Sequence, residues 1–215
     1  MESKRIKKIS LIGKLNVGKR TLLNYFVYNK KQKLWDLSIL KSGIRNDSIQ
    51  KSSDVHVKLV KFLIYDITLN PINFSNKSDV LISKIILSDL IYILVDITEG
   101  IQKETRDVLR YLMQHKKKFG IILNKIDKIQ GWVNLKISKF EKSFNNQNKF
   151  AKFEFKRLTD KILIECTSLS INTKLHYIIN ENGSDESISI IPISAKSGEG
   201  VIDLIPITQN YFRKH

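Results

Sequence analysis

Three short motifs in this chain carry residue types that can bind phosphate groups and a heterocyclic base. The first, GKLNVGK from Gly13 to Lys19, matches the first seven positions of the phosphate-loop pattern G-x-x-x-x-G-K-[ST]. Its glycines let backbone N–H groups surround a phosphate chain, and Lys19 would neutralise the outer phosphates. An ordinary glycine turn before a helix would have a similar local sequence. The candidate residues of this loop are Gly13, Lys14, Leu15, Asn16, Val17, Gly18, Lys19, Arg20 and Thr21.

The other two motifs favour guanine as the base. NKID begins at Asn124 directly after one apolar run, and SAK begins at Ser194 after the last one. The carboxylate of Asp127 can accept from N1–H and the exocyclic amine of guanine, whereas adenine presents an acceptor at N1. Because a buried polar group without a partner costs about 1–3 kcal/mol, we expect guanine to be preferred.

The remaining residues of these motifs have complementary expected roles. Asn124 could bridge the base to the phosphate loop, and the N–H of Ala195 could meet the guanine carbonyl. The stems of Lys125 and Lys196 could cover the ring faces. Taken alone, NKID could be a solvated strand end and SAK a helix start, but the three motifs occur in the required order at strand ends.

The elements that must position these motifs follow from the hydrophobic pattern. Five short apolar runs predict strands that are buried on both faces: Ile9–Ile12, Phe62–Tyr65, Ile91–Val95, Phe119–Leu123 and Ile188–Ile193. Helical patterns lie between them at 74–88, 102–115 and 150–177. This alternation predicts a doubly wound α/β fold with a mostly parallel central sheet and helices on both faces.

Two polar stretches interrupt this alternation of strands and helices. Residues 29–54 are predicted to form a long loop, and residues 130–149 a surface insertion. The length of 215 residues and the 42% hydrophobic content suit a single domain spanning residues 1–215.

Composition narrows the cellular setting. The formal net charge of +16 is compatible with contact to RNA, although lysine-rich composition without any binding role explains it about equally well. Cys166 is the only cysteine, so an internal disulfide is excluded. The four histidines have no metal-ligand spacing, so a zinc site is not expected. The charged start MESKRIKK is unlike a signal peptide, and no apolar run is long enough to span a membrane. We therefore expect a soluble protein in the cytoplasm.

On these motifs the chain resembles the G domain of translational GTPases, which have a P-loop NTPase fold, and within them initiation factor 2 and initiation factor 5B. The resemblance runs from about Ile6 to Ile205. It rests on SLIGKLNVGKRTLLNYF, SDLIYILVDITEGIQKET, GIILNKIDKIQGW and IIPISAKSGEGVIDLI. The resemblance implies binding of GTP and GDP and action on the ribosome in translation initiation, where the family couples GTP hydrolysis to the joining of the subunits. From the basic charge we expect contact with rRNA, and we expect a monomer with no membrane or DNA partner.

The chain departs from the family pattern where the family binds magnesium. Arg20 stands at the position of a threonine or serine ligand, and Thr21 is turned from it by roughly 100° along a helix. The best match to the switch sequence G-I-T is G-I-R, ending at Arg45. Mg²⁺ binding is therefore doubtful, and the arginines could supply positive charge in its place.

The second switch of the family, D-T-P-G-H, is also altered. Asp66 is retained, and it is the remaining candidate metal ligand. Leu69 lacks the freedom of the family's glycine, and Asn70 corresponds only approximately to the histidine that positions water. With the catalytic residue otherwise unassigned, we expect GTP hydrolysis to be weak or lost. The alternatives are a non-enzymatic G domain that docks on a ribosome or protein, and a basic RNA-binding protein.

Overall fold

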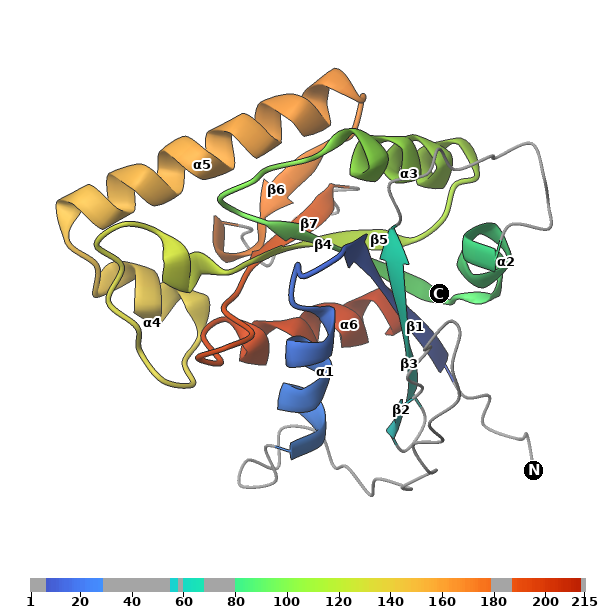
Figure 1. Ribbon diagram of the computed structural model, residues 1–215, viewed down its shortest axis with the longest axis horizontal. Coiled ribbons are helices and arrows are strands. Elements are labelled where there is room, and N and C mark those ends of the chain that lie inside the picture. Colours follow the sequence, from blue (N-terminus) through green and yellow to red (C-terminus); the bar gives the residue numbers. More distant parts are fainter. Residues whose placement is uncertain (1–6, 29–54, 58–59, 68–79, 179–186, 214–215) are drawn as a thin grey trace.

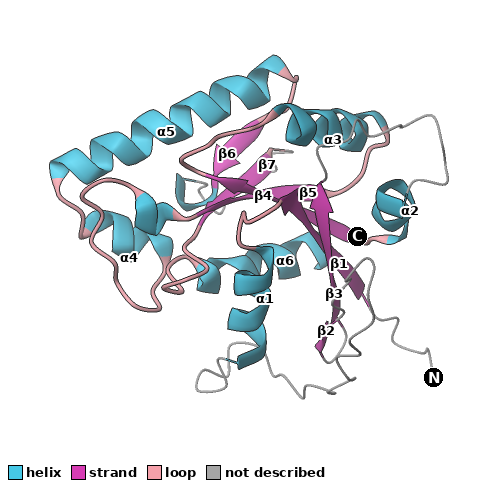
Figure 2. Cartoon of the chain, viewed as in Figure 1, coloured by secondary structure: helices cyan, strands magenta, loops and turns pink. Residues whose placement is uncertain are grey.

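The computed structural model describes residues 7–28, 55–57, 60–67, 80–178 and 187–213. These residues contain a seven-stranded sheet in the order β2-β3-β1-β4-β5-β7-β6. The strands are β1 (Lys7–Lys14), β2 (Val55–Val57), β3 (Val60–Ile67), β4 (Leu90–Asp96), β5 (Phe119–Asn124), β6 (Thr173–Leu175) and β7 (Ile188–Pro192). Each neighbouring pair is parallel except β2 with β3, which confirms the predicted mostly parallel sheet (Figure 2).

Helices cover both faces of the sheet, as predicted. They are α1 (Lys19–Tyr28), α2 (Val80–Leu87), α3 (Lys103–Gln114), α4 (Phe140–Asn145), α5 (Lys149–Ser168) and α6 (Leu204–Arg213). Figure 1 shows α3 and α5 on one face and α1 and α6 on the other. Along β4, Ile91 and Ile93 join the core under α3 and α5, whereas Tyr92 and Leu94 join the core over α1 and α6. This strand is buried on both faces, which is why its sequence is continuously apolar.

The five predicted apolar runs all correspond to strands, whereas two short strands were not anticipated. β2 and β6 have three residues each, too few to show a hydrophobic period. Residues 102–115 contain α3, and α2 occupies the described part of the predicted helix 74–88. The predicted loop 29–54 lies outside the described residues.

The helix predicted over 150–177 is wrong at its carboxyl end. α5 stops at Ser168, and Ser170 adopts a left-handed conformation with φ 59°. The N–H of Ile171 then donates to the carbonyl of Cys166, which closes the helix end. The chain leaves as β6, which pairs with β7 at the edge of the sheet. A tertiary backbone partner therefore overrides the helical pattern beyond residue 170.

The segment 130–149 contains α4 and the loops before and after it. Most of its side chains are exposed, but Trp132, Phe140 and Ser143 are buried. Phe140 and Trp132 pack against Phe155 of α5, with ring centroids 5.0 and 5.8 Å from that of Phe155. The segment is thus anchored to the core through its aromatic residues. None of the helices described here is both long and apolar enough to cross a bilayer.

Candidate functional site

The three polar motifs meet at one edge of the sheet. The phosphate loop follows β1, NKID follows β5, and SAK follows β7. Strands β1, β4, β5 and β7 are neighbours and run parallel, so their carboxyl ends lie along the same edge. This edge is where open α/β sheets bind ligands.

The phosphate loop is wrapped around the amino group of Lys19. Its Nζ donates to the carbonyl oxygens of Gly13 at 2.7 Å and Lys14 at 2.6 Å, and the residue is 4% exposed. Asn16 and Gly18 take positive φ values of 61° and 102°, which turn the backbone sharply. The two carbonyls hold the amino group at the loop that would enclose the phosphates.

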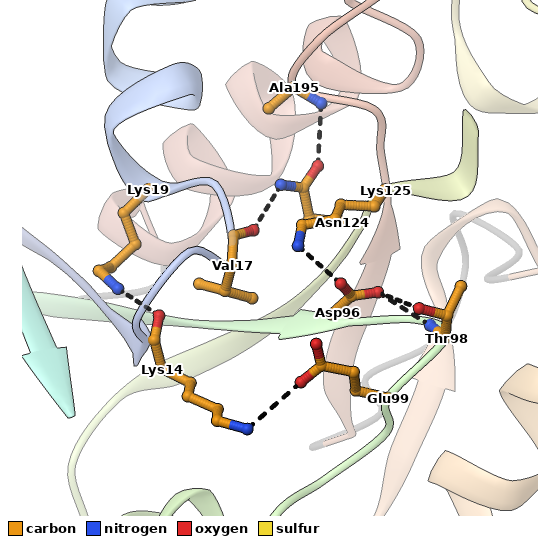
Figure 3. A network of polar contacts seen from close by, with 9 residues as sticks. All are labelled: Lys14, Val17, Lys19, Asp96, Thr98, Glu99, Asn124, Lys125 and Ala195. Atoms are coloured by element: carbon orange, nitrogen blue, oxygen red, sulfur yellow. Dashed lines mark hydrogen bonds and ion pairs between the residues drawn. The ribbon is translucent and has the colours of Figure 1, made fainter. Parts of the chain in front are cut away.

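Asn124 joins all three motifs through its side-chain amide (Figure 3). Its Nδ2 donates to the carbonyl of Val17 at 2.7 Å, and its Oδ1 accepts from the N–H of Ala195 at 2.9 Å. A Cβ at Gly18 would collide with Nδ2 of Asn124, so glycine is required at this close approach. The residue is 2% exposed, and these buried hydrogen bonds fix the phosphate loop relative to the SAK loop.

Asp127 is held by a residue of the third motif. Ser194 donates from Oγ to Oδ1 of Asp127 at 2.6 Å, and Oγ of Ser194 in turn accepts from the N–H of Ser197 at 3.1 Å. Ser194 is fully buried, whereas the side chain of Asp127 is half-buried and Lys196 is exposed. The N–H of Ala195, predicted to meet a base carbonyl, is engaged by Asn124, so a bond to a base would have to be bifurcated.

Lys125 makes an ion pair that the sequence analysis did not anticipate. Its Nζ lies 2.7 Å from Oδ2 of Asp96, which is 4% exposed, and Oδ1 of Asp96 accepts from the N–H and Oγ1 of Thr98 (Figure 3). A weaker, exposed pair joins Lys14 and Glu99 at 3.5 Å. All four charged side chains line a pocket between the phosphate loop and the turn after β4. The available sequence signal was the position of Asp96 at the end of a buried apolar run.

The Lys125–Asp96 pair gives stability that depends on pH. Burial would raise the pKa of the Asp96 carboxyl, but the hydrogen bonds from Lys125 and Thr98 outweigh it and lower that pKa. A carboxyl whose pKa is lower in the folded state stabilises the fold above its unfolded value, about 4. That contribution is lost as the pH falls through the lowered folded pKa.

We therefore expect Asp96→Asn to reduce the free energy of unfolding by about 2 kcal/mol at pH 7. The difference from the parent protein should shrink as the pH falls below about 4, measured by urea denaturation across pH. Asp107→Asn is the control, because Asp107 pairs with Arg110 on an exposed face of α3. A difference that is the same at pH 3 and pH 7 would contradict this assignment.

The structure describes only some of the residues at the positions where the family binds magnesium and positions water. Arg20 and Thr21 both have exposed side chains in the first turn of α1. Asp66 lies in β3, where its backbone pairs in register with Gly13, while Arg45 and Asn70 lie outside the described residues. Within the described part of the chain, no group of three or more His, Cys, Asp or Glu residues is placed to hold a metal ion. A guanidinium offers no lone pair to Mg²⁺, so position 20 does not fit the metal.

The sequence of this chain is similar to those of translation initiation factors. Eukaryotic translation initiation factor 5B of Schizosaccharomyces pombe is 31% identical over 121 residues, which are 56% of this chain and 11% of that protein. The probable translation initiation factor IF-2 of Methanocella arvoryzae is 36% identical over 121 residues, which are 56% of this chain and 20% of that protein. The chain thus spans no more than about a fifth of the length of either relative.

The fold comparison covers nearly the entire chain. The crystal structure of GDP-bound aIF5B from Aeropyrum pernix superposes with a TM-score of 0.68 and 20% identity, over 98% of this chain and 36% of that one. The model of the family "Elongation factor Tu GTP binding domain" matches residues 4–214. With the phosphate loop, NKID and SAK joined at one sheet edge and this match over almost its whole length, the chain belongs to the elongation factor Tu GTP-binding domain family.

Proposed function

We propose that this chain, as a single G domain, binds GTP and GDP at the edge formed by the phosphate loop, NKID and SAK. The observation that carries the proposal is the amide of Asn124, which bonds Val17 of the phosphate loop and Ala195 of the SAK loop at once. A nucleotide needs its phosphate and base subsites at a fixed separation. A single buried side chain that bonds both loops supports such a fixed separation.

Different residues bind the phosphates and the base of the nucleotide. The loop Gly13–Lys19 surrounds the phosphates, and Lys19 neutralises them. Asp127 accepts from N1–H and the exocyclic amine of guanine, in the orientation that Ser194 gives it. An amide nitrogen carries two hydrogens, so Asn124 can keep Val17 and offer the other hydrogen to the purine ring.

Hydrolysis is proposed to be weak or lost. The family's magnesium ligand in the first turn of α1 is replaced by Arg20, whose side chain is exposed and cationic. Asp66 is retained, but by itself it would supply only one carboxylate ligand to a metal ion. We propose that nucleotide affinity does not depend on Mg²⁺, because Lys19 and the loop N–H groups already provide the positive field.

The biological setting is proposed from the relatives. Two of them are named as translation initiation factors, so we propose that this chain acts on the ribosome in translation initiation, promoting the joining of the ribosomal subunits. Its formal charge of +16 would support contact with rRNA. Since hydrolysis is proposed to be weak, nucleotide-dependent docking without turnover is the form of this activity that the site favours. A rate of GTP hydrolysis strongly stimulated by ribosomes would refute the proposal of weak turnover.

Titration with GDP, GTP and ATP, each with Mg²⁺ and with EDTA, tests the proposal. We expect GDP and GTP to bind with similar affinity, ATP to bind at least about 100-fold more weakly, and EDTA to leave the values unchanged. Calorimetry gives the affinities directly. Equal binding of ATP and GTP would overturn the assignment of the base site, and complete dependence on Mg²⁺ would overturn metal-independent binding.

A further inference from the structure

The SAK loop contains a fully buried carboxylate that the nucleotide motifs do not explain. Glu199, five residues after Ser194, is 0% exposed. A carboxylate is stable in the interior only when donors surround it. The donors here come from two different parts of the chain.

One oxygen of Glu199 holds the segment 130–149. Oε1 accepts from Nε1 of Trp132 at 3.3 Å, from the N–H of Leu135 at 3.0 Å and from Oγ of Ser143 at 2.8 Å. The neighbouring backbone adds to this attachment, because the N–H of Gly200 donates to the carbonyl of Ser138 at 2.8 Å. These hydrogen bonds therefore attach the segment 130–149 to the SAK loop.

The other oxygen of Glu199 is bonded within the SAK loop itself. Oε2 of Glu199 accepts from Oγ of Ser197 at 2.6 Å, and the carbonyl of Glu199 accepts from the N–H of Ser194 at 2.9 Å. The N–H of Ser197 donates to Oγ of Ser194, which donates to Oδ1 of Asp127. Ser197 thus links the two carboxylates: its hydroxyl bonds Glu199, and its backbone N–H bonds Ser194, which in turn bonds the carboxylate that would read guanine.

We infer that Glu199 is a positioning residue for base recognition: it fixes Asp127 through Ser197 and Ser194, and it makes this orientation depend on the folded segment 130–149. The inference rests on the proposed guanine-nucleotide site. Hydrogen-bonded networks of buried groups restrict their members to one geometry, and bidentate recognition of guanine needs that geometry. Guanine selectivity would therefore be set partly by residues that never touch the base.

Comparing GDP with IDP tests this role, because IDP lacks only the exocyclic amine that Asp127 would bind. The parent protein should prefer GDP by about tenfold or more, the value of one charge-assisted hydrogen bond. In Glu199→Gln the amide nitrogen cannot accept from Ser197, which would have to reverse its hydroxyl and accept from a neutral amide. The charge-assisted link is lost, and the preference for GDP should fall to within about threefold. Ser197→Ala removes the same link while leaving the contacts to Trp132, Leu135 and Ser143, and should lower the preference similarly.

The control is Glu141→Gln, the same chemical change on the exposed surface of α4, which should keep the parental preference. A purely structural loss would weaken GDP and IDP together and leave their ratio unchanged. An unchanged ratio in Ser197→Ala, which removes the link to Glu199 altogether, would overturn the inference whether or not Glu199→Gln folds. Failure of the parent protein to bind GDP would instead overturn the proposed function itself.

Discussion

Replacing Asp127 by asparagine is expected to lower the affinity for GDP by about 100-fold and to raise the affinity for XDP. The introduced amide would set an N–H donor against the exocyclic amine of guanine, while its oxygen could still accept from N1–H. Xanthine carries a carbonyl in place of that amine, and this carbonyl can accept from the amide. Because the remaining amide oxygen can still accept from Ser194, the SAK loop should stay in place. Equilibrium titrations with GDP and XDP measure both changes.

The matched control for this exchange is Asp160→Asn, on the exposed face of α5, which should leave both affinities unchanged. The xanthine arm separates recognition from folding, because a damaged protein would lose both ligands. Weaker binding of both GDP and XDP in Asp127→Asn would contradict the assignment of Asp127 to the base.

Lys19→Ala is expected to weaken GDP binding by about 10- to 100-fold while leaving the affinity for guanosine unchanged. The buried amino group of Lys19 is the cation that the carbonyls of Gly13 and Lys14 hold at the phosphate loop. Guanosine has no phosphate, so its affinity does not depend on that charge. Competition titrations against a fluorescent guanine nucleotide give both constants.

Lys161→Ala, on the exposed surface of α5, is the control for the loss of a positive charge. It should change neither affinity beyond the effect of net charge, which salt would screen. Equal losses for GDP and guanosine in Lys19→Ala would mean that the lysine supports the fold of the loop and not the phosphates.

Much of the fold could be predicted because its signals are local. The runs at Ile91–Val95 and Phe119–Leu123 are apolar on both faces, and only strands in the middle of a covered parallel sheet need that pattern. The end of α5 was predicted wrongly, because β6 depends on a partner, β7, that lies more than ten residues further along the chain. A strand of three residues is too short to show the hydrophobic pattern from which a strand is predicted.

The sequence by itself determined the residue types and the order of the phosphate loop, NKID and SAK, since each motif is contiguous and directly follows an apolar run. A link from Asn124 to the phosphate loop was expected from the sequence, and the structure gives its partner as Val17, 107 positions away. Only the tertiary structure showed that Lys125 pairs with Asp96 and that Glu199 accepts from Trp132 and Ser143. These contacts exist because parallel strands bring distant loops to one edge, and burial makes each polar group there find a partner.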